Sequence, residues 1–155
     1  MILDVTAGNR TMWRCKRPDN VVYVDVELEL RVPPDVIADS RYLPFRPGVF
    51  DVVFFDPPHA WNKRSSVHSD PKRTHGAYYG WERYRTWPEL LKYMHMTVRE
   101  IRRVLKPGGV VWFKWSSTAK PIDRVLSVFT GWRELLRIRS GDSRARAPAW
   151  WVMMT

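Results

Sequence analysis

The stretch that decides the fold is Phe50-Asp-Val-Val-Phe-Phe-Asp-Pro-Pro-His59. Its apolar run, residues 52–55, is typical of a parallel strand that is covered on both faces. Pro57 and Pro58 have no amide hydrogen to add to a strand ladder, so the strand is predicted to stop at Asp56. Because ligands bind beyond the carboxyl ends of strands in open α/β sheets, Asp56 is a candidate catalytic carboxylate. The alternative is a capping Asp before a proline turn.

Three more acidic residues stand at the ends of short apolar segments. Residues 1–5, 21–25 and 36–39 each have the composition of a short strand. Parallel strands of one sheet end at the same edge, so these acids are expected to meet there. The predicted row of carboxylates is Asp4, Asp25, Asp39 and Asp56.

The second half of the chain alternates helix and strand. Apolar residues at helical spacing predict a long helix that begins at Pro88 and is closed by Lys106-Pro-Gly-Gly109. The prediction is an α/β fold in one domain, residues 1–155, with a mostly parallel sheet, a C-terminal antiparallel hairpin and helices on both faces. The remaining elements are a short helix near 12–15, a strand at 110–115, a helix at 122–129, and hairpin strands at 132–138 and 149–154.

The composition points to a polyanionic partner. Lys and Arg number 26 against 16 Asp and Glu, which gives a formal net charge of +10, and the chain has nine Trp. A solvated basic surface is the alternative. The single cysteine, Cys15, excludes an internal disulfide and is interpreted as a core residue. With no signal core and no apolar segment near the ~18–20 residues that cross a bilayer, we expect a cytoplasmic protein.

Residues 60–87 lack clear periodicity and interleave six aromatic with six basic side chains. A loop of this length inside a compact domain is commonly functional. We expect a mobile insertion that stacks on bases and neutralises phosphates, or a lid that closes on a pocket. The candidate substrate-binding residues are Trp61, Lys63, Arg64, Tyr78 and Tyr79, together with Lys114 in the strand after the long helix.

Taken in order, these motifs resemble the class I S-adenosylmethionine-dependent methyltransferases over nearly the whole chain. They are Asp4-x-x-x-Gly8, the strands that end in Asp25 and Asp39, Asp56-Pro-Pro-His59, and Leu105-Lys-Pro-Gly-Gly109 before a strand. Asp-Pro-Pro followed by a ring resembles enzymes that methylate the exocyclic amino groups of adenine or cytosine. With the late Phe113-Lys-Trp115, the motif also resembles small phage- and prophage-type methyltransferases. The resemblance implies a Rossmann-like fold and S-adenosyl-L-methionine as cofactor.

The resemblance also implies a cofactor site at the first strand ends. Asp25 would accept the ribose hydroxyls, and Gly8 would let the backbone approach the cofactor. Asp4 would lie near the methionine end, and Asp39 with the Ser40 backbone would receive the adenine amino group. The full implied set is Asp4, Thr6, Ala7, Gly8, Asp25, Val26, Asp39, Ser40 and Asp56.

The catalytic residues implied are Asp56, Pro57, Pro58 and His59. Methyl transfer from a sulfonium mostly needs alignment. The Asp56 carboxylate and the Pro57 carbonyl would accept both hydrogens of the amino group and draw its lone pair toward the methyl group. His59 stands where the family usually has a larger aromatic ring, so stacking on the base would pass to Trp61 or Tyr78.

Two other function classes stay open. One is a methyltransferase of this fold that acts on a small molecule or a protein, which the basic aromatic loop disfavours. The other is a nucleic-acid binder without turnover, which the intact Asp56-Pro57-Pro58 disfavours. Methylation of a ring carbon needs a thiolate, and Cys15 is placed away from the centre. His68 and His75 lack the partners of a metal site. The sequence shows no separate recognition domain, which low sequence specificity, a partner subunit, a homodimer or a structured RNA target would each explain.

Overall fold

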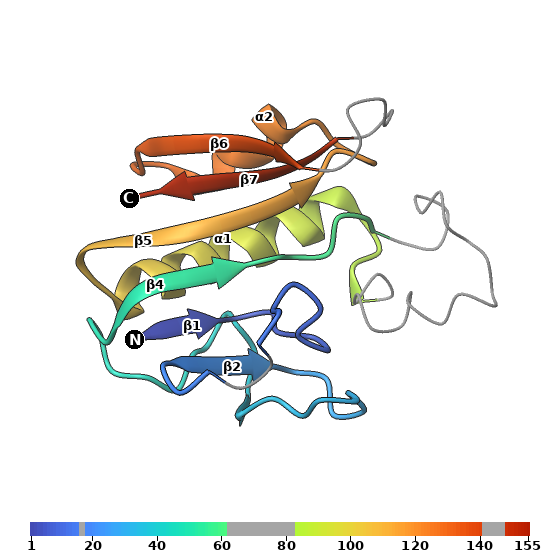
Figure 1. Cartoon of the computed structure of the whole chain (residues 1–155). Coiled ribbons are helices and arrows are strands. Elements are labelled where there is room, and N and C mark those ends of the chain that lie inside the picture. Colours follow the sequence, from blue (N-terminus) through green and yellow to red (C-terminus); the bar gives the residue numbers. More distant parts are fainter. Residues whose placement is uncertain (16–17, 62–82, 141–147) are drawn as a thin grey trace.

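The computed structural model describes residues 1–15, 18–61, 83–140 and 148–155. One seven-stranded sheet runs through it in the order β3-β2-β1-β4-β5-β7-β6 (Figure 1). Strands β1 to β5 are parallel, and β7 is antiparallel to both β5 and β6. The predicted mostly parallel sheet with a C-terminal antiparallel hairpin is confirmed. The strands are β1 (Ile2–Asp4), β2 (Val21–Asp25), β3 (Val36–Ile37), β4 (Phe50–Phe55), β5 (Leu105–Ser116), β6 (Glu134–Ser140) and β7 (Ala149–Met154).

The long helix α1 (Trp87–Val104) connects β4 to β5. It begins where Thr86 accepts a hydrogen bond from the Glu89 amide with its side chain, and a proline lies in its first turn. It ends at Val104 because Leu105 already pairs with Phe50 in the sheet. The Lys-Pro-Gly-Gly segment therefore lies inside β5, at the shift in its register against β4, and does not form a separate turn. After β5 come the short helix α2 (Ile122–Val125) and the 3-10 helix η3 (Leu126–Phe129).

The core lies between these helices and one face of the sheet. Leu3, Val53 and Val111 stand side by side in neighbouring strands and are fully buried. Helix α1 covers them with an apolar stripe that includes Leu90 and Met94, also fully buried. This packing fixes the register of the strands, because a slip of one residue would turn each buried side chain to the other face.

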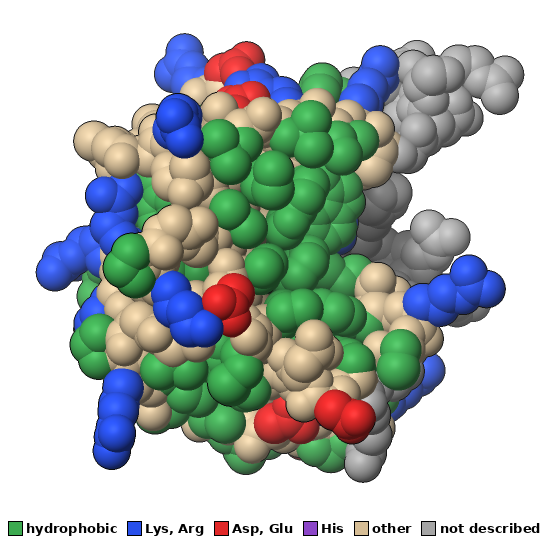
Figure 2. Space-filling view, turned by 60° about the vertical axis from the view of Figure 1, so that its left-hand side comes forward, with side chains coloured by type: hydrophobic (Ala, Val, Ile, Leu, Met, Phe, Trp, Pro, Cys, Tyr) green, Lys and Arg blue, Asp and Glu red, His purple; other side chains and the backbone are tan. Residues whose placement is uncertain are grey.

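The opposite face of the sheet carries no helix in the part of the chain that the structure describes. Its central row includes Phe54, Trp112 and Met153, and the loop after β1 covers one end of the row with Trp13. The expectation of helices on both faces is therefore wrong for these residues, because α1, α2 and η3 all contribute to one core cluster. In Figure 2, hydrophobic side chains form a continuous area across the molecule, with Lys and Arg side chains around it.

The loop after β1 also replaces the short helix expected near residues 12–15. Two successive turns form there, in which the Arg10 amide donates to Ala7 and the Trp13 amide donates to Arg10. Arg10 has a φ of 54°, in the left-handed region, so the chain cannot continue as a right-handed helix. Cys15 is exposed, and its interpretation as a core residue is wrong. No helix in the described ranges has the length and apolar composition to span a membrane.

Candidate active site

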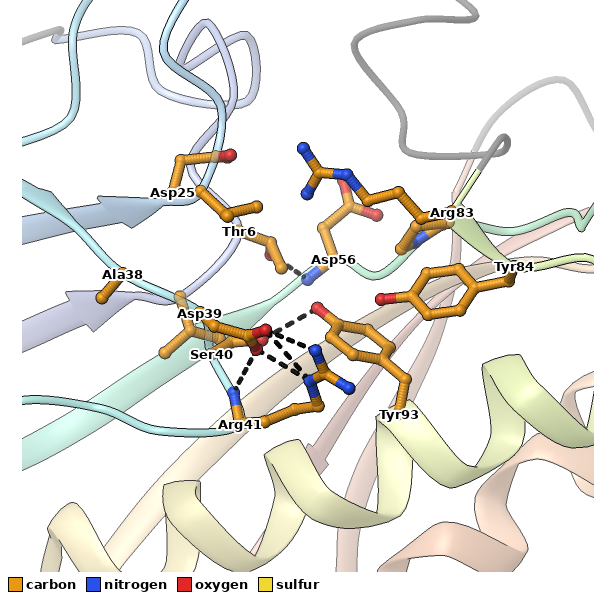
Figure 3. Close-up of a pocket in the computed structure, with 13 residues that line it drawn as sticks. Thr6, Asp25, Ala38, Asp39, Ser40, Arg41, Asp56, Arg83, Tyr84 and Tyr93 are labelled. Carbon is orange, nitrogen blue, oxygen red and sulfur yellow. Dashed lines mark hydrogen bonds and ion pairs between the residues drawn. The ribbon is translucent and has the colours of Figure 1, made fainter.

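A cavity of about 470 Å³ opens at the carboxyl ends of β1, β2 and β4 (Figure 3). Open α/β sheets bind their ligands at this edge. The cavity joins parts of the chain that are far apart in sequence, from the loop after β1 to helix α1. Its lining is Val5, Thr6, Asp25, Val26, Ala38, Asp39, Ser40, Arg41, Asp56, Pro58, Arg83, Tyr84 and Tyr93.

Asp25 is held at the cavity by two backbone amides. Its Oδ2 accepts a hydrogen bond of 2.8 Å from the Gly8 amide, and its Oδ1 accepts one of 2.9 Å from the Glu27 amide. Gly8 has a φ of 49°, which a residue with a side chain rarely adopts. Ala7 is buried beside it, and the Ala7 amide donates to Val24. Each carboxylate oxygen still has a lone pair for a ligand hydroxyl.

Asp39 is paired with Arg41, which the sequence did not single out. The Arg41 guanidinium donates to both carboxylate oxygens, at 3.0 Å from Nε to Oδ1 and 2.6 Å from Nη2 to Oδ2. These hydrogen bonds hold the pKa of Asp39 below its usual range, against the effect of burial. The carboxylate predicted for the adenine amino group is thus ionised and partly occupied by a cation that lines the same cavity.

Asp4 lies behind the cavity wall and is not part of its lining. It is fully buried, and its oxygens accept hydrogen bonds from the Trp13 indole at 2.7 Å and from the Thr6 amide at 3.1 Å. Burial raises the pKa of Asp4 to about 7, and these two hydrogen bonds only partly oppose that effect. The sequence predicted that Asp4 lies near the methionine end of a cofactor. In the structure its carboxylate instead contacts the loop after β1.

Asp56 stands at the tip of β4 and is 14% exposed. Its amide donates a 2.8 Å hydrogen bond to the Thr6 hydroxyl, which ties the strand tip to the loop after β1. Lys114 Nζ donates to Asp56 Oδ2 at 2.6 Å, and His59 Nε2 lies 3.1 Å from Oδ1. Burial raises the pKa of Asp56, but His59 and Lys114 outweigh it and the pKa is lower than that of a free Asp. The carboxylate is therefore ionised at neutral pH.

His59 packs into the wall of this centre. Its ring meets the Trp115 ring edge to face at a centroid distance of 5.2 Å, and its side chain is 19% exposed. Among the described residues, His59 Nδ1 is buried without a hydrogen-bond partner. Pro57 is buried, while Pro58 lines the cavity. The ring is held by Trp115 and Asp56 and does not present an open stacking surface.

Two tyrosines complete the cavity: Tyr84, one of the six aromatic residues of the segment 60–87, and Tyr93, which the sequence did not single out. The rings of Tyr84 and Tyr93 are 4.9 Å apart, and Tyr93 Oη lies 2.9 Å from Ser40 Oγ. Ser40 Oγ is also 3.1 Å from the Thr97 hydroxyl, so three buried side chains share hydrogen bonds. Tyr93 and Thr97 are four residues apart on the buried stripe of α1. Two hydroxyl groups four residues apart on an otherwise apolar helix face could have indicated a buried polar contact in the sequence.

The predicted substrate residues are placed only in part. Trp61 packs against Trp87 at a ring distance of 5.3 Å, with Lys120 Nζ 5.6 Å from its ring, and it does not line the cavity. Lys114 contacts Asp56. Most of the expected insertion at 60–87 lies outside the described residues, and so do Lys63, Arg64, Tyr78 and Tyr79. Within the described ranges, no group of three His, Cys, Asp or Glu side chains is arranged for a metal ion.

The strand order and the cavity at the carboxyl edge define a Rossmann-like fold of the methyltransferase type. Similar solved structures include a protein of Pyrococcus horikoshii OT3, with a TM-score of 0.64 and 14% identity over 99% of this chain and 80% of that one. The N-methyltransferase NodS from Bradyrhizobium japonicum has a TM-score of 0.62 and 10% identity over 99% and 83% of the two chains.

An rRNA methylase from Streptococcus thermophilus has a TM-score of 0.54 and 12% identity over 99% of this chain and 84% of that one. NodS has also been solved in complex with S-adenosyl-L-homocysteine. No protein-family model matches the sequence, and no curated protein does. At these identities the likeness establishes the fold, and the chemistry has to be argued from the site.

Proposed function

We propose that this chain is an S-adenosylmethionine-dependent methyltransferase that methylates an exocyclic amino group of adenine or cytosine in DNA or RNA. The observation that carries the proposal is one cavity that has Asp25 and Asp39 on one side and Asp56 on the other. The likeness to NodS and to the rRNA methylase supports methyl transfer, and the complex of NodS with S-adenosyl-L-homocysteine supports the cofactor.

The donor set of the cavity fits the cofactor. The Asp25 carboxylate is fixed by two amides and can accept the hydroxyls of a ribose. Tyr84 and Tyr93 offer aromatic surface for a purine next to Asp39, which can accept from its amino group. When bound, S-adenosylmethionine supplies a methyl group on a sulfonium whose leaving group is already activated.

The chain's own contribution is to prepare the acceptor nitrogen. An aromatic amino group is a poor nucleophile because its lone pair is delocalised into the ring. If the Asp56 carboxylate and the Pro57 carbonyl each accept one of its hydrogens, the lone pair is directed toward the methyl group. The nitrogen would then bond to the methyl carbon as the carbon–sulfur bond breaks, and the proton that it loses would pass to solvent by way of the Asp56 carboxylate that accepts its hydrogen bond. An ionised and rigidly held Asp56 suits this role.

The charge of the chain supports nucleic acid as the partner. A net charge of +10 attracts a polyanion, and the segment 60–87 supplies aromatic and basic side chains close in sequence to Asp56. A partner subunit or a homodimer would add target selection. The exposed thiol of Cys15 suits the reducing cytoplasm.

One observation favours a second candidate, the methylation of an amine on a small molecule or a protein. His59 occupies the position of the family's stacking ring, yet it lies edge-on to Trp115 and is 19% exposed. A base extruded from a duplex would therefore depend on another ring for stacking.

The test is to incubate the purified chain with S-adenosylmethionine that carries a deuterated methyl group and with separate pools of DNA, RNA and protein. Each pool is then digested and examined by mass spectrometry. The proposal expects labelled methyladenine or methylcytosine from one nucleic-acid pool, and no label with Asp56→Ala. Label only in protein or in a small amine would establish the second candidate, and no label in any pool would contradict both.

A further inference from the structure

Lys114 is built into the sheet beside the candidate catalytic carboxylate. It lies on β5, directly opposite Trp151 of β7, and its Nζ is 5.9 Å from the Trp151 ring centroid. Its side chain is 27% exposed, and Nζ lies 2.6 Å from Asp56 Oδ2. A short, charge-assisted hydrogen bond from a strand residue is a rigid contact. Lys114 is thus less suited to meeting a mobile substrate than to holding Asp56.

The other carboxylate oxygen of Asp56, Oδ1, differs from Oδ2 in its hydrogen bonding. Among the described residues, Asp56 Oδ1 is buried and accepts no hydrogen bond. His59 Nε2 is 3.1 Å from it, but the alignment is not that of a hydrogen bond. An unsatisfied buried carboxylate oxygen is costly and persists where a function uses it. His59 Nε2 occupies the place beside Oδ1 that the amino group of a substrate would have to take.

We propose that Lys114 is a positioning residue that holds Asp56 Oδ2 and so reserves Oδ1 for the amino group of the substrate, with His59 covering Oδ1 until the substrate displaces it. The proposal rests on the methyltransferase function proposed above. It changes the expected role of Lys114 from a contact with substrate to a contact with Asp56. The substrate then meets one oriented acceptor oxygen beside the Pro57 carbonyl, which suits a donor with two hydrogens.

Several ionisable groups lie near Asp56 and influence how it responds to the loss of Lys114. His59 comes from its own loop and Lys114 from β5, while Asp4 of β1 interacts with it through space. Asp25 of β2 and Arg83, which precedes α1, line the same cavity. Without Lys114, one of the two side chains that lower the pKa of Asp56 against the effect of burial is lost. The pKa of Asp56 should then rise.

The chain offers a matched control in the same two strands. Lys106 of β5 donates to Asp51 of β4 at 2.8 Å, but these side chains are 47% and 51% exposed. Both pairs join β4 to β5 at opposite edges of the sheet. Lys106→Met therefore removes an equal charge and an equal ion pair without touching the candidate centre.

The experiment follows the side-chain carboxyl carbons of ¹³C-labelled aspartate by NMR during a pH titration, with Asp56→Asn to assign the Asp56 signal. The wild-type chain, Lys114→Met, Lys114→Arg and Lys106→Met are compared. We expect the midpoint of Asp56 to rise by at least one pH unit in Lys114→Met, to return largely toward wild type in Lys114→Arg, and to stay in place in Lys106→Met. An Asp56 midpoint within ~0.3 unit of wild type in Lys114→Met overturns the proposal. If Lys114→Met does not fold, Lys114→Gln takes its place under the same criterion.

Methyl-transfer rates add a second readout. In Lys114→Met the pH at which kcat falls to half of its plateau on the acid side should move up together with the Asp56 midpoint, with cofactor affinity within about threefold. An unchanged acid limb of the pH profile argues against the positioning role even if kcat falls. The titration needs no turnover, so a shifted Asp56 midpoint in a chain that methylates nothing refutes the proposed function and leaves the Lys114–Asp56 contact standing. A wild type that methylates, with no shift in Lys114→Met, refutes only the role of Lys114.

Discussion

The two ends of β4 carry the same pair of residue types in opposite surroundings. At the amino end, Asp51 pairs with Lys106 and with the N-terminal amine, and its side chain is 51% exposed. At the carboxyl end, Asp56 pairs with Lys114 and lies beside His59, and its side chain is 14% exposed. Both carboxylates have a lowered pKa, that of Asp51 to about 2 mainly through the hydrogen bond from Lys106.

The two pairs differ in how far their surroundings shield them from water. The Asp51 pair is open to solvent, so water and salt screen it and it contributes little. The Asp56 pair is largely shielded, borders a cavity and leaves one oxygen without a hydrogen bond. Breaking a shielded pair leaves an uncompensated charge, which costs far more. Substitutions at the carboxyl ends of the strands should therefore have larger effects than the matching substitutions at the amino ends.

The largest expected effect is that of Asp56→Ala on methyl transfer. Removing an oriented acceptor that acts on the transition state should lower kcat by roughly 100- to 1000-fold, about 3–4 kcal/mol. Asp51→Ala removes an equal charge at the other end of the strand and should leave kcat within about twofold. Rates under saturating cofactor decide the matter. An equal loss of kcat in Asp56→Ala and Asp51→Ala would mean that Asp56 has no special role in methyl transfer.

Asp4 should make the stability of the fold depend on pH. Its pKa is raised from 3.8 to about 7 in the folded chain, so the folded state binds the proton more tightly than the unfolded state. This carboxyl group therefore makes folding progressively less favourable as pH rises from about 4 to 7. The side chain that replaces it in Asp4→Asn cannot ionise. The free energy of unfolding of the wild type, minus that of Asp4→Asn, should therefore fall by on the order of 3 kcal/mol between pH 4 and pH 8.

Urea unfolding of wild type and Asp4→Asn at a series of pH values measures this difference. Asp51→Asn is the matched control, because its carboxylate has a lowered pKa and should give the opposite slope at low pH. A constant difference between wild type and Asp4→Asn over the whole range would contradict the burial of an ionisable Asp4.

The next effect concerns the cofactor. Asp25→Ala removes the carboxylate that two amides orient toward the cavity, and it should weaken S-adenosylmethionine binding by about one to two decades. Equilibrium dialysis with labelled cofactor gives the ratio of dissociation constants. Asp51→Ala should bind as the wild type does. If Asp25→Ala binds S-adenosylmethionine as tightly as the wild type, Asp25 does not contact the ribose.

The smallest expected effect is that of Tyr93→Phe. It deletes the hydroxyl that lies 2.9 Å from Ser40 Oγ and should cost about 1 kcal/mol of stability, a fall in Tm of roughly 2–4 °C. Tyr42 is 66% exposed, so Tyr42→Phe should leave the Tm unchanged. Calorimetric scans of both variants test whether the hydroxyl network at the cavity is part of the stable core.

The strands could be predicted from sequence because their signals are local. An apolar run that stops at Asp56-Pro57-Pro58 fixes both the end of β4 and the place of its carboxylate. The conformation of the loop after β1 could not be predicted, because the residues around Arg10 and Trp13 are also compatible with a short helix. What decides their conformation is a contact with Asp4 and a left-handed backbone angle at Arg10, and neither is visible along the chain.

The residues that line the cavity also fall into those that the sequence could predict and those that it could not. Asp25, Asp39 and Asp56 were predictable because each ends a strand or follows one, and parallel strands bring such ends together. Arg41 and Tyr93 were not, since nothing in their local sequence marks them as cavity residues. They line the cavity only through the tertiary fold. The same holds for Lys114, whose partner Asp56 is 58 residues away.

If the cavity at the carboxyl ends of the strands binds S-adenosylmethionine, it should also bind S-adenosyl-L-homocysteine, which titration calorimetry measures. This demethylated product cannot donate a methyl group, so the heat reports binding alone. We expect saturable binding at a one-to-one ratio in wild type and Asp51→Ala, and binding at least tenfold weaker in Asp25→Ala. No heat from the folded wild type at millimolar ligand, or equal binding by Asp25→Ala, would contradict it.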